Sequence, residues 1–384
     1  MTAARSATIG VNLLWLVPGV VGGSEEYTLR LLRALSDQEP DDLHLRIYGQ
    51  AALFETHPDL IDRFTAVTAP QGPLGKVGRI GLEATWLAAA SHDDDLVHHA
   101  GGVVPPVRMA PPVLTVHDLQ PLELPHYFSV AKRTWLATMI PRSVQAARVT
   151  ICPSRFTAEA IAARFGLSAD RLAVVPQGLD GVTAGPNPPE VAAELAATYG
   201  RYLLYPAIAY PHKRHADVVR ALAALAERHP DVSVVFSGRP GPETPSLEAL
   251  ATELGVADRL HIVGRVPVDR LDALYRSATA VAFPSAYEGF GNPVLEAMAR
   301  GCPVIASDAT ALPEVVGDAG LTVPLGDVAA LAAAAERLLT DSTLAAELAD
   351  AGPVRSGRYT TPDAAHRLAS AYRRALRPTR EHSP

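Results

Sequence analysis

Short unbroken runs of apolar residues alternate along the chain with longer stretches in which apolar positions recur every three or four residues. The runs are typical of strands covered on both faces, and the recurring positions are typical of helices with one buried face. In the N-terminal half this pattern predicts strands at residues 7–14, 43–49, 95–99, 112–117, 148–152 and 171–176, with the clearest helices at 24–36 and 154–165. Such an alternation predicts a doubly wound α/β domain built on a parallel sheet.

The same alternation starts again after residues 180–190, a stretch rich in glycine and proline that is the best candidate for a linker. The pattern beyond it predicts strands at 202–207, 232–237, 259–263, 279–284, 303–306 and 321–323, and helices at 213–228, 246–254, 268–276, 292–300, 327–340 and 361–377. The sequence therefore predicts two doubly wound domains, which suits a length of 384 residues.

Charge and cysteine content restrict the class of protein. A net charge of -7 argues against nucleic acid as the main partner. Cys152 and Cys302 are too few for a disulfide framework, so we expect reduced, buried thiols in a cytoplasmic protein. The apolar stretch at 9–23 resembles a signal peptide, but Asn12 and Pro18 interrupt it, and a first strand followed by a glycine-rich loop explains it better. No apolar run is long enough to span a bilayer.

A basic stretch in the first half bears on membrane contact. Lys132, Arg133 and Arg142 surround apolar side chains such as Trp135. This composition is compatible with peripheral contact with the anionic inner face of a membrane. Pro141 is expected to break the helix, however, so an ordinary surface helix is the preferred interpretation.

The densest candidate chemistry lies between Glu288 and Glu296, in a stretch that we interpret as strand, loop and helix. Pro293 suits the first helical turn and Asn292 suits the cap. Such a loop delivers backbone N–H groups to a helix start, which is a site for phosphate. Carboxylates near a helix start are often only partners of its dipole. However, Glu296 comes one residue too late for a capping box counted from Asn292, and Glu288 precedes the helix altogether. We therefore favour a functional role for both.

Lys213 and Arg214 open a predicted helix, where the dipole favours negative charge. That local conflict predicts an anionic ligand, with Lys213 neutralising a diphosphate leaving group. A solvent-facing side chain is the alternative for both residues, and the stronger one for Arg214. Gly238 with Arg239 follows one predicted strand and Val266 follows the next, so both segments are candidate ligand loops. Ordinary turn glycines are the alternative there.

Two features of the N-terminal half also lie where a predicted strand ends or the next helix begins. Gly22 and Gly23 precede a predicted helix and permit close approach of a ligand, with an ordinary turn as an equal alternative. His117 ends a strand, where a neutral imidazole can donate to a substrate hydroxyl, and a structural histidine is the alternative. Asp118 is expected to orient that ring or to cap the next turn. His98 and His99 also end a strand, without a ligand pattern that predicts a metal.

The chain resembles the retaining GT-B glycosyltransferases of glycosyltransferase family 4. The stretch from Glu288 to Glu296 looks like the E-x7-E signature of that family. Other motifs follow in the family's order: Gly22-Gly23, His117-Asp118, the VPQGLD stretch at 175–180, the PHK stretch at 211–213, the RGCPVIA stretch at 300–306 and the LPEV stretch at 312–315. The resemblance covers most of the chain and is most specific in the C-terminal motifs.

The resemblance implies a GT-B fold, with two Rossmann-like doubly wound parallel-sheet domains facing a central cleft. Residues 1–183 would form the acceptor-side domain, 184–362 the nucleotide-sugar domain, and 363–384 a helix crossing back to the first. It also implies that Glu296 binds the ribose and that Glu288 contacts the donor sugar. The loop amides around Phe290, Gly291 and Asn292 would hold the diphosphate, and His117 would contact a sugar hydroxyl. Metal ligands are not expected, because basic side chains and the helix start take that role.

The sequence departs from the family pattern at three positions. Ile208 stands where many members have an arginine that assists the lysine of the diphosphate segment. Arg214 and Gln177 stand where asparagine is usual. A second positive charge must therefore come from elsewhere, and Arg239 and Arg214 are the candidates.

Together these expectations describe a retaining glycosyltransferase with Glu288, His117 and Lys213 as catalytic residues. The donor would be a GDP- or UDP-linked hexose, with GDP-mannose favoured by the PHK variant and the His117 context, and the acceptor a saccharide or lipid-linked saccharide. No cofactor, metal or nucleic acid is expected. The alternatives are a GT-B epimerase or phosphorylase, and a non-catalytic scaffold. A phosphorylase would need a cofactor lysine, and the chain has only three lysines.

Overall fold

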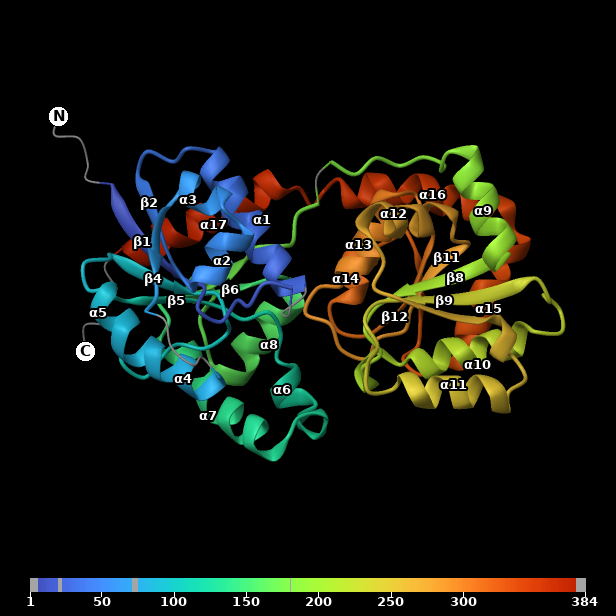
Figure 1. Ribbon diagram of the computed structural model, residues 1–384, viewed down its shortest axis with the longest axis horizontal. Coiled ribbons are helices and arrows are strands. Elements are labelled where there is room, and N and C mark those ends of the chain that lie inside the picture. The colour runs from blue at the N-terminus through green and yellow to red at the C-terminus, as the bar shows by residue number, and fades with distance from the viewer. Residues whose placement is uncertain (1–5, 20–22, 71–74, 180, 378–384) are drawn as a thin grey trace. The chain divides into compact units, whose positions relative to one another are not determined.

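Residues 6–19, 23–70, 75–179 and 181–377 are described in a computed structural model of the chain, which divides into two compact units (Figure 1). Unit 1 comprises residues 1–178 and 361–384, and unit 2 comprises 179–360. These divisions lie within a few residues of those expected from the sequence. The last helix, α17 (Thr361–Leu376), belongs to unit 1 although the whole of unit 2 precedes it along the chain.

Unit 1 is built on a parallel sheet of seven described strands in the order β3-β2-β1-β4-β5-β6-β7. The strands are β1 (Ala7–Asn12), β2 (Leu43–Gly49), β3 (Thr65–Thr68), β4 (Leu96–His99), β5 (Pro112–Thr115), β6 (Val149–Cys152) and β7 (Leu172–Val174). The hydrophobic pattern predicted six of them. It missed β3, an edge strand of four residues whose side chains are only partly buried or exposed.

Helices cover the sheet of unit 1 and separate its core into clusters. They are α1 (Gly23–Asp37), α2 (Ala51–Thr56), α3 (Asp59–Arg63), α4 (Lys76–Leu82), the π-helical turn η1 (Glu83–Leu87), α5 (Ala88–Ala90), α6 (Gln120–Glu123), α7 (Val130–Ala146), α8 (Arg155–Phe165) and α17. Apolar residues of α1 and α17 share one core cluster with those of β1 and β2, while α7 and α8 pack with β5 in another. Burial on both faces explains why strands such as β5 and β6 are largely apolar.

The basic stretch in unit 1 corrects one expectation. Helix α7 runs without interruption through Pro141, so this proline does not break it. Its amphipathic character is weak, with Leu136, Ile140 and Val144 buried against the sheet. Among the residues placed by the structure, no helix combines the length and the apolar composition required to cross a membrane.

Unit 2 repeats the architecture with a parallel sheet of six described strands in the order β10-β9-β8-β11-β12-β13. The strands are β8 (Arg201–Pro206), β9 (Val232–Ser237), β10 (Leu260–Gly264), β11 (Ala280–Phe283), β12 (Val304–Ser307) and β13 (Leu321–Val323). The helices are α9 (Pro189–Tyr199), α10 (His215–Leu225), α11 (Thr244–Glu253), α12 (Val268–Ser277), α13 (Asn292–Ala299), α14 (Leu312–Val316), α15 (Val328–Thr340) and α16 (Ser342–Ser356). All six strands agree with the predicted ones to within one or two residues.

Each sheet reverses its strand order once. In unit 1 the chain starts at β1, adds β2 and β3 on one side, and then crosses to add β4 on the other. In unit 2 it starts at β8, adds β9 and β10, and crosses to β11. Doubly wound sheets bind ligands at the carboxyl ends of their strands beside such a reversal. A ligand is therefore expected at the residues that follow β1 and β4 in unit 1, and at those that follow β8 and β11 in unit 2.

Candidate functional site

A lysine and a glutamate meet at the strand-order reversal of unit 2. The Lys213 Nζ donates to Glu288 Oε1 at 2.5 Å, and both side chains are largely enclosed, with 17% and 13% of their surface exposed. Lys213 ends a short turn after β8, and its carbonyl accepts a hydrogen bond from Tyr205. Glu288 follows β11, and its N–H donates to Thr310 Oγ1 at 3.0 Å. The two charges are therefore held from both sides of the reversal by backbone contacts.

The imidazoles beside Lys213 are neutral. Burial, reinforced by the Lys213 charge, lowers the pKa of His212 to about 4. Burial also lowers the pKa of His215 to about 3. The His215 ring stacks on Tyr205 with 4.2 Å between centroids, and the Lys213 ammonium lies 5.3 Å from the centroid of Phe283. Apart from Glu288, the Lys213 ammonium is thus surrounded by aromatic and neutral groups, a setting in which an anion is attracted strongly.

Arg214 is oriented by an acid. Its Nε donates to Asp217 Oδ2 at 2.5 Å, and the Asp217 side chain is buried. The residue has a left-handed backbone with φ of 55° and precedes the first residue of α10. The interpretation that Arg214 simply faces solvent is therefore wrong, since the guanidinium is engaged within the unit.

The loop before α13 is shaped by a glycine. Gly291 has φ of 108°, and a Cβ at this position would lie 2.7 Å from the Leu312 side chain. Gly291 itself occupies the position before the helix and Asn292 is the first helical residue, so the prediction that Asn292 caps the helix is wrong. No described side chain caps this helix start. Pro293 has no N–H and those of Val294 and Leu295 donate to the Gly291 carbonyl, so the N–H groups of Gly291 and Asn292 are the ones suited to an anion.

Two aromatic residues support this helix. Phe290 is buried and packs edge-to-face against Tyr359, with centroids 5.5 Å apart, which anchors the loop. Further along, the Tyr275 hydroxyl donates to Glu296 Oε2 at 2.8 Å. Burial, and then the neighbouring Glu296, raise the pKa of Tyr275 far above its usual value, so the phenol remains a donor. Tyr275 therefore orients the half-buried Glu296 carboxylate.

The other residues predicted for this site differ in their surroundings. Gly238 has φ of 144°, and a Cβ there would come within 2.8 Å of the Ala207 carbonyl, so the loop after β9 requires glycine to approach the end of β8. Arg239 follows it and is exposed. Val266 follows β10 at the sheet edge and packs against the core, with β9 between its strand and β8. Its contacts are those of a packing residue.

His117 follows β5 in unit 1 and is held as a neutral ring. Its Nε2 lies 3.1 Å from the Ala100 carbonyl oxygen, which requires the proton on Nε2. Burial lowers the pKa of His117 below its ordinary value. Tyr27 and Trp15 pack around the ring at 5.7 and 6.3 Å between centroids. The partner residue Asp118 accepts from the N–H of Gln120 and so caps the following turn.

The glycine pair is described only in part. Gly23 is the first residue of α1, as expected for a glycine at a helix start. Gly22 lies outside the described residues.

Asn12 and His99 end the two strands at the reversal of unit 1 and were not predicted as site residues. Asn12 Oδ1 accepts from the Leu14 N–H, which directs the amide nitrogen to His99 Nδ1 and to Glu83 Oε1, both at 3.3 Å. His99 Nδ1 is thus an acceptor, so Nε2 carries the proton. The only sequence signal for His99 was its position at a strand end, since strand order cannot be read from hydrophobicity.

The histidine that precedes His99 at this edge is engaged by two hydroxyl groups. His98, next to His99, has both ring nitrogens within hydrogen-bonding distance of hydroxyls, those of Tyr372 at 2.8 Å and Thr115 at 2.7 Å. Within the described ranges, no group of three or more His, Cys, Asp or Glu side chains is arranged to hold a metal ion. The contacts of His98 are those of a structural residue.

Comparisons with known proteins agree with the motifs. The family model of glycosyl transferases group 1 matches residues 190–355, and that of glycosyltransferase family 4 matches residues 21–181. The O-antigen chain mannosyltransferase B of Escherichia coli is 30% identical over 253 residues, which cover 65% of this chain and 66% of that protein. The MMP alpha-(1->4)-mannosyltransferase of Mycolicibacterium hassiacum is 30% identical over 315 residues, which cover 76% of this chain and 74% of that protein.

Solved structures share the fold. The crystal structure of Anabaena Alr3699/HepE in complex with UDP and glucose matches with a TM-score of 0.74, at 21% identity, over 96% of this chain and 99% of that chain. At this level of identity the match concerns the architecture. It confirms the predicted pair of parallel-sheet α/β domains of the GT-B type.

Proposed function

Because the chain belongs to the group 1 glycosyl transferases of glycosyltransferase family 4, we propose that it transfers a hexose, with mannose favoured, from a nucleoside diphosphate to a saccharide or lipid-linked acceptor. Membership of the family confirms the resemblance seen in the sequence and makes the protein a transferase. Two relatives are named as mannosyltransferases, which supports mannose. The further proposals are retention at the anomeric carbon, GDP as the nucleotide, and catalysis without a metal or other cofactor.

The observation that carries this function is the ion pair between Lys213 and Glu288 at the strand-order reversal of unit 2. A diphosphate bound at the start of α13 would meet backbone N–H groups, and Lys213 would supply a charge. When the donor binds, the Lys213 ammonium would turn from Glu288 toward the diphosphate. Glu288 would then be available to the hydroxyls of the donor sugar, and Glu296, held by Tyr275, to those of the ribose.

The proposed reaction takes place on one face of the sugar. The bond between the anomeric carbon and the diphosphate oxygen breaks, and the acceptor hydroxyl oxygen bonds to that carbon from the same side. The acceptor proton passes to the departing diphosphate oxygen, so charge and protons balance without a separate base. Stabilisation of the diphosphate by positioned donors would be the main contribution to the rate. Lys213 and the helix start supply the positive charge that other transferases obtain from a metal ion.

Binding of nucleotides tests the donor site directly. We expect the wild-type protein to bind GDP at micromolar concentration and more tightly than UDP or dTDP in calorimetric titrations. Replacing Glu296 with alanine removes contacts to the ribose, which should weaken binding by about tenfold, since a hydrogen bond to a charged group contributes about 1.5–3 kcal/mol. The matched control is Glu248→Ala, which removes an exposed carboxylate of α11.

The outcomes separate the alternatives. No binding of any of the three nucleotides would favour the scaffold, and unchanged affinity in Glu296→Ala would refute the ribose contact. If nucleotides bind, incubation with nucleotide sugars followed by mass spectrometry and NMR of the product identifies the hexose and the anomeric configuration. An inverted product would refute the one-face reaction.

A further inference from the structure

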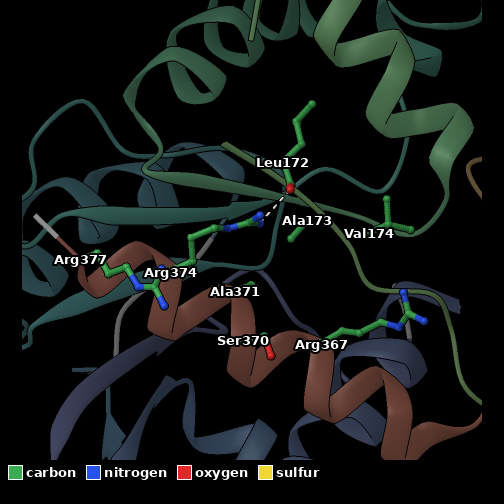
Figure 2. Close-up of a pocket in the computed structure, with 8 residues that line it drawn as sticks. All are labelled: Leu172, Ala173, Val174, Arg367, Ser370, Ala371, Arg374 and Arg377. Atoms are coloured by element: carbon green, nitrogen blue, oxygen red, sulfur yellow. Dashed lines mark hydrogen bonds between the residues drawn. The ribbon is translucent and has the colours of Figure 1, made fainter. Parts of the chain in front are cut away.

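A polar hollow lies in unit 1, whereas the residues assigned to the donor belong to unit 2. It has a volume of about 430 Å³ and lies between edge strand β7 and helix α17 (Figure 2). It is lined by Arg367, Ser370 and Arg374 of α17 and by Arg377, which directly follows the helix, and the strand contributes residues 172–174. We propose that this hollow, the arginine groove, binds phosphate or a phosphate-bearing group.

The spacing of the lining residues places them on one face of α17. Arg367, Ser370, Arg374 and Arg377 are three or four residues apart, which aligns them along one side of a helix. The opposite side of α17 is apolar and buried in the core of unit 1. Ala371 of α17 and Ala173 of β7, whose side chains are small, also line the hollow and leave space beside the guanidinium groups.

Arg374 is the central residue of the groove. Its Nη2 donates to the Leu172 carbonyl at 2.7 Å, and Figure 2 shows the side chain reaching from α17 to β7. Its Nε is buried without a hydrogen-bond partner among the described residues. The guanidinium therefore faces a neutral carbonyl and has an unsatisfied donor. A half-buried cation in this state is stabilised by an anion brought close to it.

Carboxylates do not neutralise the groove completely. Arg367 pairs with Asp363 at 2.7 Å, and the neighbouring Arg373 pairs with Asp42 at 2.7 Å. Arg377 is exposed, and no described carboxylate forms an ion pair with it. Asp170 interacts electrostatically with Arg374, but burial lowers the Arg374 pKa by more than this acid raises it. A net positive field therefore remains in a chain whose formal charge is -7.

The dipole of α17 gives an incomplete account of this arrangement. Basic side chains are favoured in the last turn of a helix, which explains a preference for arginine near residue 376. The effect of the dipole falls off within one turn, however, so it does not account for Arg367 or for the space between the arginines and β7. A phosphate oxygen pair matches the planar fork of a guanidinium, and two arginines one turn apart suit a single phosphate.

The test compares two sources of phosphate on the full chain. Inorganic phosphate is titrated against the wild type and against Arg374→Gln/Arg377→Gln, with binding followed by calorimetry while GDP occupies the donor site. Phosphatidylglycerol vesicles are then compared with phosphatidylcholine vesicles by cosedimentation. The matched control removes two exposed arginines of unit 2, Arg337→Gln/Arg358→Gln. The single variant Arg377→Gln keeps the contact of Arg374 with β7, so it tests the groove even if the double variant fails to fold.

We expect phosphate or anionic vesicles to bind the wild type, about tenfold weaker binding in the double variant, and wild-type binding in the control. Binding of phosphate without vesicles identifies a soluble ligand, and binding of vesicles identifies a lipid headgroup. The proposal is overturned if neither probe binds, or if the control loses binding as strongly as the groove variant. Donor binding is measured in the same samples, so a failure here is distinct from a failure of the proposed transferase activity.

Discussion

The strand-order reversals of the two units occupy equivalent places in their sheets but carry opposite kinds of polar groups. In unit 2 a lysine and a glutamate form an ion pair. In unit 1 the corresponding strand ends carry Asn12 and His99, joined by a neutral hydrogen bond. A charged pair suits a ligand whose own charge increases during the reaction, whereas neutral groups suit hydroxyls that stay uncharged. We therefore propose that unit 2 holds the diphosphate, and that the neutral groups of unit 1 contact sugar hydroxyls other than those proposed for Glu288 and Glu296.

Burial has different consequences at the two edges. In unit 1 it lowers the pKa of His98 and of His99 to about 3, so their rings stay neutral at physiological pH. In unit 2 the Lys213 ammonium instead forms an ion pair with Glu288. The two edges therefore differ in whether their buried polar groups are neutral or paired with an opposite charge.

The largest effect is expected from removing the positive charge in unit 2. Lys213→Ala should lower kcat by about a hundredfold or more, as is usual for loss of one positioned donor to a developing charge. Steady-state kinetics with the identified donor measures this change. Lys132→Ala, which removes a lysine of α7 in unit 1, is the matched control and should retain wild-type activity. A near-normal rate in Lys213→Ala would contradict the division between a charged and a neutral edge.

A smaller effect is expected from acid on the neutral edge of unit 1. The pKa of His98 is about 3 in the folded protein, below its ordinary value of 6.5, so the unfolded chain binds more protons between these values. The stability linked to His98 is therefore complete above pH 6.5 and is lost as the pH falls toward 3. As the pH falls from 6.5 to 5, one such group lowers the free energy of unfolding by about 2 kcal/mol.

Denaturant unfolding at several pH values measures this dependence. His98→Gln removes the titrating ring, so the slope of unfolding free energy against pH should become shallower than in the wild type. The slope is the informative quantity, because losing the contacts with Tyr372 and Thr115 lowers stability at every pH. An unchanged slope would show that His98 is not the neutral group that the comparison requires.

The sequence predicted the charged edge better than the neutral one. Lys213 was recognisable because its charge conflicts with the dipole at a helix start, and Glu288 because it precedes a helix that does not require its carboxylate. Asn12 and His99 were missed, because their meeting depends on β1 pairing with β4, and an apolar run does not specify its neighbours. Local backbone detail was also missed. The sequence predicted Asn292 as the N-cap of α13, but the N-cap is Gly291. Its φ of 108° is a backbone conformation that glycine adopts readily and other residues rarely do. Edge strand β3 was not predicted, because its partly buried and exposed side chains do not form an apolar run.

The smallest effect is expected at His117, where the two edges are best distinguished. His117→Gln should lower kcat/KM by about fivefold, because a neutral hydrogen bond contributes about 1 kcal/mol. GDP affinity should not change, since the nucleotide contacts proposed here come from unit 2. The ring is already neutral in the wild type, as burial lowers its pKa, so the pH profile of the variant should parallel that of the wild type. Weaker GDP binding in His117→Gln would mean that unit 1 also holds the nucleotide, and the separation of charged and neutral edges would fail.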